Sequence, residues 1–251
     1  MRKVRIALLI FLGGVIAAAQ SGMTLVRTTT LQGNTHHVQG IEFDERRLWV
    51  TSVDRADRKG YLQEFTLSTG EHVRTTAVES GDRFHPGGLA ADLASLWLPV
   101  AEYRRESSSL IQKRNTRTFE LEFQFEVADH IGCIAAAPGV LIGANWDSRT
   151  FYIWDRTGRL IRKVPNPTPN AYQDLKFVDG VLVGAGLLPG KVGAIDWLEY
   201  PSLRLLRRLT TGETTRAVPY TNEGMAIRGD RVLLLPEDAP SRLFEFRIDP
   251  R

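Results

Sequence analysis

The sequence predicts an all-β protein, a five-bladed β-propeller with four strands in each blade. Three observations support this: a motif that recurs five times at intervals of 42–50 residues, four strand-like segments in nearly every repeat, and no sustained helical period. Four strands within about 40–50 residues are typical of one propeller blade.

Each repeat opens with polar residues, usually followed by a glycine, and then runs into an apolar strand. The five openings are HVQG at 37–40, HPGG at 85–88, DHIG at 129–132, AYQD at 171–174 and TNEG at 221–224. A turn signal and a second apolar run follow each of them. Continuous apolar runs of this kind fit strands that are buried on both faces.

Third and fourth strands, with more alternating polarity, complete the repeats. We expect third strands at residues 61–67, 109–115, 151–157, 193–200 and 243–249. Fourth strands are expected at residues 72–78, 121–127, 160–166 and 205–211. The fifth repeat stops after its third strand, and the strand-like segment 23–30 belongs to no repeat. We therefore expect this N-terminal strand to pair with the last blade and close the ring, which removes an open sheet edge.

Residues 1–19 have the features of a secretory signal peptide. Arg2, Lys3 and Arg5 precede an apolar run over residues 6–19, which ends in three alanines. A basic start, a short apolar stretch and small residues at the cleavage site define such signals. The run is too short to span a bilayer comfortably, and no second apolar segment follows it. We expect a secreted or periplasmic protein with one propeller domain, residues 20–251, and no membrane span.

Removing the signal peptide leaves a formally neutral chain. The whole chain has 32 Lys and Arg against 29 Asp and Glu, and three of these basic residues lie in residues 1–19. Nucleic-acid-binding proteins carry an excess of positive charge that pairs with phosphates. We therefore expect no nucleic-acid partner, and instead a monomer that binds a small polar or anionic ligand.

Polar residues at the strand starts are expected to meet at one mouth of the central channel, because the first strand of every blade lines that channel. The ends of the second strands should reach the same face from further out. Polar groups gathered in this way cost about 1–3 kcal/mol each when they are buried without a partner. We therefore expect a water molecule, an ion or a ligand among them.

The candidate residues fall into three groups. The candidate catalytic residues are His37, His85, His130 and Asp174. The candidate metal ligands are Asp129, Asp174 and Glu223, because neighbouring carboxylates repel unless a proton or a cation bridges them. The candidate ligand-binding residues are Gln39, Glu102, Arg104, Asn145, Asp147, Arg149, Gln173, Asn222 and Glu237. Carboxylates with amide oxygens suit Ca²⁺ and histidines suit Zn²⁺, so both cations remain candidates.

The motifs also resemble those of a known family. The strings HHVQG, HPGG, PVAEYRRESS, DHIG, NWDSR, NAYQDLKF, NEGMA and LLPEDAPSRLFEF are similar to an exported β-propeller family of unknown function from bacteria and fungi. More distantly, the segment 222–224 resembles metal-ligand positions of propeller lactonases and esterases, and the segment 39–41 resembles a blade opening of the plant-type glutaminyl cyclases. The resemblance implies a propeller but no assigned activity.

Two classes of function fit these observations. The first is a metal-assisted hydrolase or lyase that acts on a small polar substrate. The second is a non-catalytic module that binds a ligand or a protein in the funnel. A wet channel with a purely structural role is the simpler alternative to both.

Overall fold

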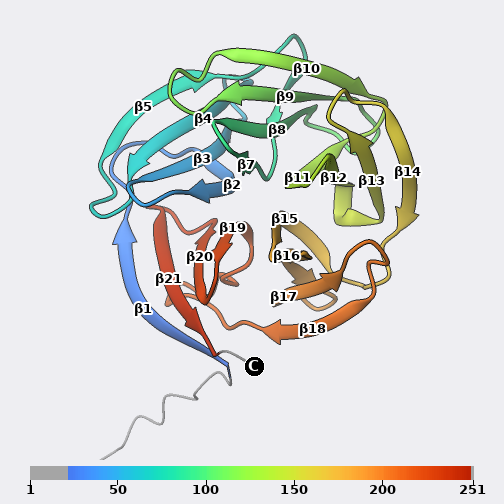
Figure 1. Ribbon diagram of the computed structural model, residues 1–251. Coiled ribbons are helices and arrows are strands. Elements are labelled where there is room, and N and C mark those ends of the chain that lie inside the picture. Colours follow the sequence, from blue (N-terminus) through green and yellow to red (C-terminus); the bar gives the residue numbers. More distant parts are fainter. Residues whose placement is uncertain (1–21, 250–251) are drawn as a thin grey trace, which may run out of the picture.

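The five-bladed ring that the sequence predicts is confirmed. The computed structural model describes residues 22–249, which form five antiparallel sheets around a central axis (Figure 1). The predicted signal peptide, residues 1–19, lies outside the described residues. Within residues 22–249, no helix is long and apolar enough to cross a membrane.

The strands of each blade follow one another from the axis outward, apart from the last blade. Blade 1 contains β2 (His37–Phe43), β3 (Arg47–Asp54), β4 (Lys59–Thr66) and β5 (His72–Ala77). Blade 2 contains β6 (Arg83–Pro86), β7 (Ala90–Asp92), β8 (Ser95–Glu102), β9 (Ser109–Asn115) and β10 (Leu121–Val127). Blade 3 contains β11 (Ile131–Ala137), β12 (Val140–Asn145), β13 (Thr150–Asp155) and β14 (Leu160–Pro165).

The remaining strands belong to blades 4 and 5. Blade 4 contains β15 (Ala171–Val178), β16 (Val181–Leu188), β17 (Val192–Glu199) and β18 (Leu205–Thr210). Blade 5 contains β19 (Glu223–Arg228), β20 (Arg231–Pro236), β21 (Arg242–Ile248) and, on its outside, β1 (Met23–Thr30). One short 3₁₀ helix, η1 (Trp146–Ser148), follows β12. Apolar side chains form five buried clusters in the described chain, one between each pair of neighbouring blades.

The strand β1 closes the ring, as the sequence predicts. It pairs antiparallel with β21, from Met23 opposite Ile248 to Thr30 opposite Arg242. Met23 is buried in the apolar cluster between blades 4 and 5, and Arg27 forms an ion pair with Glu245 at 3.0 Å. Blade 5 therefore consists of strands from both ends of the described chain.

The inner strand of blade 2 is interrupted between β6 and β7. The break lies at Gly87 and Gly88, where blade 2 touches β11 of blade 3. The backbone amide of Gly88 donates to the carbonyl of Gly132 at 2.9 Å. A Cβ atom at Gly87 would lie only 2.0 Å from that same carbonyl oxygen. Glycine is needed here because the two backbones approach so closely.

Four of the five inner strands also carry a β-bulge near their start. The register shifts occur between Val38 and Gly40 in β2, Arg83 and His85 in β6, Ile131 and Cys133 in β11, and Tyr172 and Asp174 in β15. A bulge places two residues of one strand opposite one residue of its partner and changes the direction of their side chains. The polar starts of these strands are therefore not simple alternating segments.

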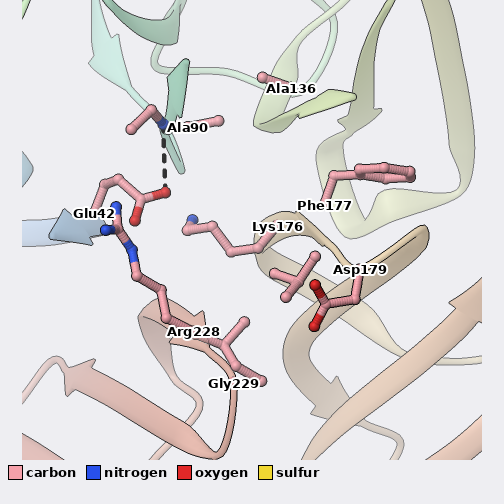
Figure 2. A pocket seen from close by; sticks show the side chains of 11 residues that line it. Glu42, Ala90, Ala136, Lys176, Phe177, Asp179, Arg228 and Gly229 are labelled. Carbon is pink, nitrogen blue, oxygen red and sulfur yellow. Dashed lines mark hydrogen bonds between the residues drawn. The ribbon is translucent and has the colours of Figure 1, made fainter. Parts of the chain in front are cut away.

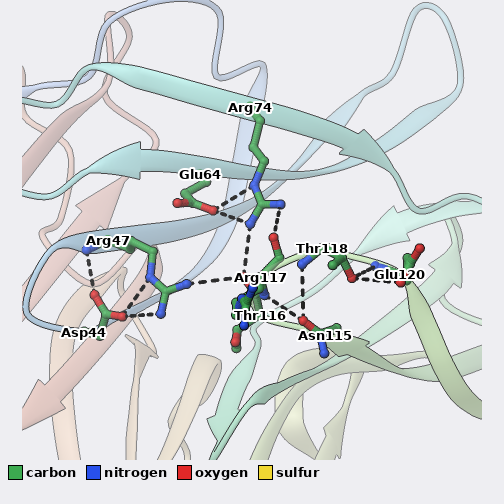
Figure 3. Close-up of polar contacts among 9 residues, drawn as sticks. All are labelled: Asp44, Arg47, Glu64, Arg74, Asn115, Thr116, Arg117, Thr118 and Glu120. Carbon is green, nitrogen blue, oxygen red and sulfur yellow. Dashed lines mark hydrogen bonds and ion pairs between the residues drawn. The ribbon is translucent and has the colours of Figure 1, made fainter.

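Polar contacts join the outer parts of blades 1 and 2 (Figure 3). The guanidinium group of Arg74 binds Glu64 within blade 1 and donates to the carbonyl of Thr116 at 3.0 Å, in the turn between β9 and β10. It also lies over the ring of Phe119, 3.9 Å from its centroid. One arginine thus satisfies turn carbonyls of the next blade and covers an aromatic ring.

Candidate functional site

A cavity of about 170 Å³ lies where the five inner strands begin. Every blade contributes to its wall. The lining residues are His37, Gln39, His85, Tyr103, His130, Gly132, Asn145, Trp146, Asp147, Tyr172, Gln173 and Glu223. Three of them, Gln39, Gly132 and Gln173, are the residues at which the register shifts in β2, β11 and β15. The bulges therefore help to form the cavity wall.

The hydrogen bonds of Gln39 fix the protonation of His85. The side-chain nitrogen of Gln39 donates to the carbonyl of Val38 at 3.0 Å, so the amide oxygen of Gln39 faces Nε2 of His85 at 2.9 Å. An amide oxygen only accepts, so Nε2 carries the proton and Nδ1 is an acceptor. This Nδ1 atom is buried and has no hydrogen-bond partner in the described chain. Burial, with the nearby charges of His130, His37 and Arg55, holds the pKa of His85 well below its usual value.

His130 is a second neutral imidazole in the wall. Its Nδ1 atom lies 2.8 Å from the carbonyl oxygen of Arg104, so Nδ1 is the donor and Nε2 is left as an acceptor. Only 2% of the residue is exposed, and burial lowers its pKa. The rings of His130 and Trp146 meet edge to face at a centroid distance of 4.5 Å. His85 and His130 are thus uncharged at neutral pH, and each has one nitrogen with a free lone pair.

Glu223 is a carboxyl residue in the wall of the cavity. Its carboxyl group is buried, and it makes no hydrogen bond or ion pair with any other residue in the range 22–249. Burial, with the carboxylates of Glu237 and Asp174, raises the pKa of Glu223 to about 8. Its φ angle is 115°, a region that side-chain-bearing residues rarely adopt and that costs about 1–3 kcal/mol. Such strain is concentrated at functional sites.

Glu223 lies beside His37 and Glu237, and these three residues form a group that could hold a metal ion. One ligand atom from each lies within 4.8 Å of the others. Nδ1 of His37 and a carboxylate oxygen of Glu237 are 3.0 Å apart, yet Nδ1 lacks a hydrogen bond of good geometry in the described chain. Burial lowers the pKa of His37 more than Glu237 raises it, so the imidazole is neutral at pH 7. Of the predicted metal ligands, only Glu223 belongs to this group.

Asp174 lies outside the cavity wall, on the axis. Its carboxylate accepts hydrogen bonds from the backbone amides of Ile41, Leu175 and Met225 at 2.9–3.1 Å and from Nζ of Lys176 at 2.5 Å. Asp174 occupies the position that is glycine in the other four openings. Because both of its oxygens are used and it is fully buried, this geometry gives it a role in joining the blades. Burial raises its pKa to about 6, and Lys176 opposes this.

Asp129 also lies outside the lining. Its carboxylate accepts hydrogen bonds from the amide nitrogen of Asn145 at 3.0 Å and from the hydroxyl of Tyr152 at 2.5 Å. The structure does not bring it together with Glu223 in a metal-binding group. Asp129 instead orients Asn145, which lines the cavity.

The other predicted ligand-binding residues lie at different depths. Gln39, Asn145, Asp147 and Gln173 line the cavity. Glu237 is half exposed at the rim, and the carbonyl of Asn222 accepts a hydrogen bond from its backbone amide at 3.0 Å. Outside the lining, Glu102 pairs with Arg104 at 2.7 Å, and Arg149 pairs with Asp147 at 3.6 Å.

Three aromatic residues of the wall were not predicted: Tyr103, Trp146 and Tyr172. Tyr103 and Trp146 directly follow Glu102 and Asn145, the polar residues that end the second strands of blades 2 and 3. The ring centroids of Tyr103 and His85 are 4.2 Å apart. In these two blades, the aromatic residue directly after the polar strand end is a usable signal in the sequence, whereas Tyr172 has no such signal.

A second pocket, of about 360 Å³, lies at the opposite ends of the inner strands (Figure 2). Glu42, Lys176, Asp179 and Arg228 supply its charged groups, and in Figure 2 Lys176 extends toward Glu42. Nζ of Lys176 already binds Asp174 and the carbonyls of Leu89 and Leu175. The ammonium group of Lys176 is therefore committed to contacts on the axis.

Comparison with known proteins supports the fold and leaves the activity open. Residues 53–174, about half of the chain, match a family described as "Family of unknown function (DUF6454)". This confirms the resemblance to a family of unknown function. A comparison with curated proteins found no match.

Among solved structures, a glutaminyl cyclase from Myxococcus xanthus is similar, with a TM-score of 0.70 and 16% identity, covering 90% of this chain and 96% of that one. The WD40 domain of Neurospora crassa Pan2 is similar with a TM-score of 0.52 and 9% identity, covering 92% and 97%. At such low identities these likenesses show the propeller fold alone.

Proposed function

We propose that the cavity binds a small polar ligand beside a divalent cation held by His37, Glu223 and Glu237, and that the protein is a metal-dependent hydrolase or lyase. The observation that carries this proposal is the carboxyl group of Glu223. It is buried and strained in its backbone, and it makes no hydrogen bond or ion pair within residues 22–249. It lies next to the neutral imidazole of His37, whose Nδ1 has no hydrogen bond of good geometry in the same range.

The donor set fits a first-row transition metal better than Ca²⁺. Two ligand atoms that are 3.0 Å apart, like those of His37 and Glu237, subtend about 90° at an ion placed about 2.1 Å from each. One imidazole with two carboxylates suits Zn²⁺ or Mn²⁺, because Ca²⁺ takes oxygen ligands only. Of the two cations expected from the sequence, we therefore favour Zn²⁺.

The residues around the three ligands would position a substrate and move a proton. A bound cation would supply Lewis-acid polarisation of a carbonyl oxygen. His85 and His130 each retain one nitrogen that can accept a proton, and Gln39 holds the ring of His85 in place. Tyr103 and Trp146 offer flat surfaces to the ligand. The cavity is thus equipped for acid–base chemistry at a carbonyl group.

The reaction panel should include lactones, esters and small amides. It should also include cyclisation of N-terminal glutamine, because one similar solved structure is that of a glutaminyl cyclase. Tight ligand binding without any turnover would favour the alternative, a non-catalytic binding module.

The metal site is tested by thermal melts of chelator-stripped protein at pH 6.5 and 8.5, with and without Zn²⁺, Mn²⁺ or Ca²⁺. Without a cation, the protein should be less stable at pH 8.5. The raised pKa of Glu223, about 8, means that the folded state keeps a proton that the unfolded state has lost, and this stabilisation disappears as the pH rises through 8. The loss between pH 6.5 and 8 is roughly 1.5 kcal/mol. The lowered pKa values of His37, His85 and His130 act in the opposite direction, because the unfolded histidines still release protons above pH 6.5. This gain is about 0.4 kcal/mol for each histidine in this window. The loss due to Glu223 is therefore read from the difference between the wild type and Glu223→Gln, which keeps all three histidines.

Zn²⁺ should reverse the loss, because the cation replaces the proton at Glu223. At 100 times its dissociation constant it would add about 2.7 kcal/mol. Glu223→Gln should remove both the alkaline loss and the response to Zn²⁺, whereas Glu120→Gln, in an exposed turn, should change neither. A wild-type protein that ignores all three cations would overturn the metal site.

We also propose export, on the basis of the basic and apolar pattern of residues 1–19. Exported protein should begin near Gln20. Amino-terminal sequencing that finds Met1 on exported material would contradict this.

A further inference from the structure

The mouth of the cavity carries four arginines, and only one of them lacks a carboxylate partner. Arg104 pairs with Glu102 at 2.7 Å, while Arg105 and Arg149 pair with Asp147 at 2.6 and 3.6 Å. Arg55, in the turn between β3 and β4, makes no ion pair or hydrogen bond with another residue in the described range 22–249. Its positive charge is therefore available to a ligand.

The guanidinium group of Arg55 is held at the cavity by an aromatic ring. Its central carbon lies 4.7 Å from the ring centroid of Tyr103, which lines the cavity. Stacking uses the flat face of a guanidinium group and leaves its N–H edges free for an anion with two oxygens. Arg55 is thus oriented for paired hydrogen bonds.

The positive charge of Arg55 acts electrostatically on residues that line the cavity. It helps to lower the pKa values of His37 and His85 and opposes the rise in the pKa of Tyr103. The carboxyl groups on this side are Glu223 inside the cavity and Glu237 at its rim, where an oxygen of Glu237 lies 3.0 Å from Nδ1 of His37. Arg55 thus brings to the rim of the cavity a positive charge that has no carboxylate partner among residues 22–249.

We propose that Arg55 binds a carboxylate of the ligand, so that the substrate is a small carboxylic acid whose reacting carbonyl group lies inside the cavity. This deepens the proposed function and rests on it. A single guanidinium group balances one negative charge, which fits a carboxylate. A phosphate dianion would need more positive charge, and Glu237 at the same rim would repel it. The ligand is then held at two points, by Arg55 outside and by the acid–base groups within.

The test compares two probes of nearly equal size, succinamate and succinamide, of which only the first carries a carboxylate. Isothermal titration should be done on the full mature protein with Zn²⁺ present. The wild type should bind succinamate at least tenfold more tightly than succinamide. Arg55→Gln should abolish this preference without changing the affinity for succinamide, and Arg55→Lys should keep part of it, because lysine retains the charge but loses the planar fork.

Arg58 provides a matched control in the same turn. It also stacks on an aromatic ring, that of Phe84, but it pairs with Asp82 and does not line the cavity. Arg58→Gln should keep the full preference for succinamate.

Three results would overturn the assignment of Arg55: an unchanged preference in Arg55→Gln, equal binding of both probes by the wild type, or no binding of succinamate at millimolar concentration. Displacement of succinamate by inorganic phosphate at lower concentration than by acetate would assign the rim to phosphate and overturn it as well. The melts with Zn²⁺ remain a separate readout. A normal Zn²⁺ response with any of these results leaves the proposed metal site standing, whereas a missing response contradicts that site itself.

Discussion

Asp174→Asn is expected to destabilise the protein by about 3–5 kcal/mol, the cost of breaking a buried ion pair. The carboxylate of Asp174 accepts hydrogen bonds on both oxygens, from Ile41, Leu175, Met225 and Lys176. An asparagine side chain has one acceptor oxygen, so its NH₂ group would face donors, and the ammonium group of Lys176 would remain buried without a counter-charge. Thermal melts should show a decrease of roughly 10 °C.

The double variant Asp174→Asn with Lys176→Met separates the ion pair from the backbone contacts. It removes the buried ammonium group and should therefore be less destabilised than Asp174→Asn alone. Loss of activity in Asp174→Asn would not identify a catalytic aspartate, because the fold is damaged at the same time. An unchanged melting temperature would show that Asp174 does not hold the blades together.

Deletion of residues 23–30 is expected to abolish stable, monomeric folding. The deletion removes the whole β1–β21 ladder, the buried side chain of Met23 and the ion pair between Arg27 and Glu245. The strand β21 would become an open edge, which favours aggregation. Size-exclusion chromatography and thermal melts of the truncated protein should show aggregates and no cooperative transition.

A surface substitution in the same strand is the matched control. Val26 is 55% exposed, so Val26→Thr should change stability by no more than about 0.5 kcal/mol. A truncated protein that remains monomeric with the wild-type melting temperature would refute the closing role of β1.

The ring could be predicted because its signals are local. Turn residues, apolar runs and the repeated openings recur in every blade, and Ser109–Asn115 and Leu121–Val127 were expected with the bounds that the structure shows. The close contact of Gly87 and Gly88 with β11 could not be predicted in this way. It depends on how closely the backbone of blade 3 approaches, which a pattern within blade 2 does not contain.

The location of the site could be predicted, but not which of the polar side chains line the cavity. The polar strand starts do gather at one mouth of the channel. However, Gln173 lines the cavity and its neighbour Asp174 does not, because the strand bulges between Tyr172 and Asp174. A bulge depends on pairing across strands and is not visible in one segment. The sequence places Asp174 among the polar openings. In the structure its carboxylate packs so closely against Gly88 that a Cβ atom there would lie only 2.6 Å away. Its position against the glycines of other blades is a three-dimensional property.

The discontinuous last blade also has a consequence for how the chain folds. Arg27 and Glu245, which meet across β1 and β21, are 218 positions apart in the sequence. During synthesis β1 is made first, and it has no partner until the last blade has been made. Pairings between such distant segments form slowly, because a long loop must close before they contribute any stability. Until then β1 is an unpaired strand with an exposed edge, so the nascent protein is most prone to aggregate just before its ring closes.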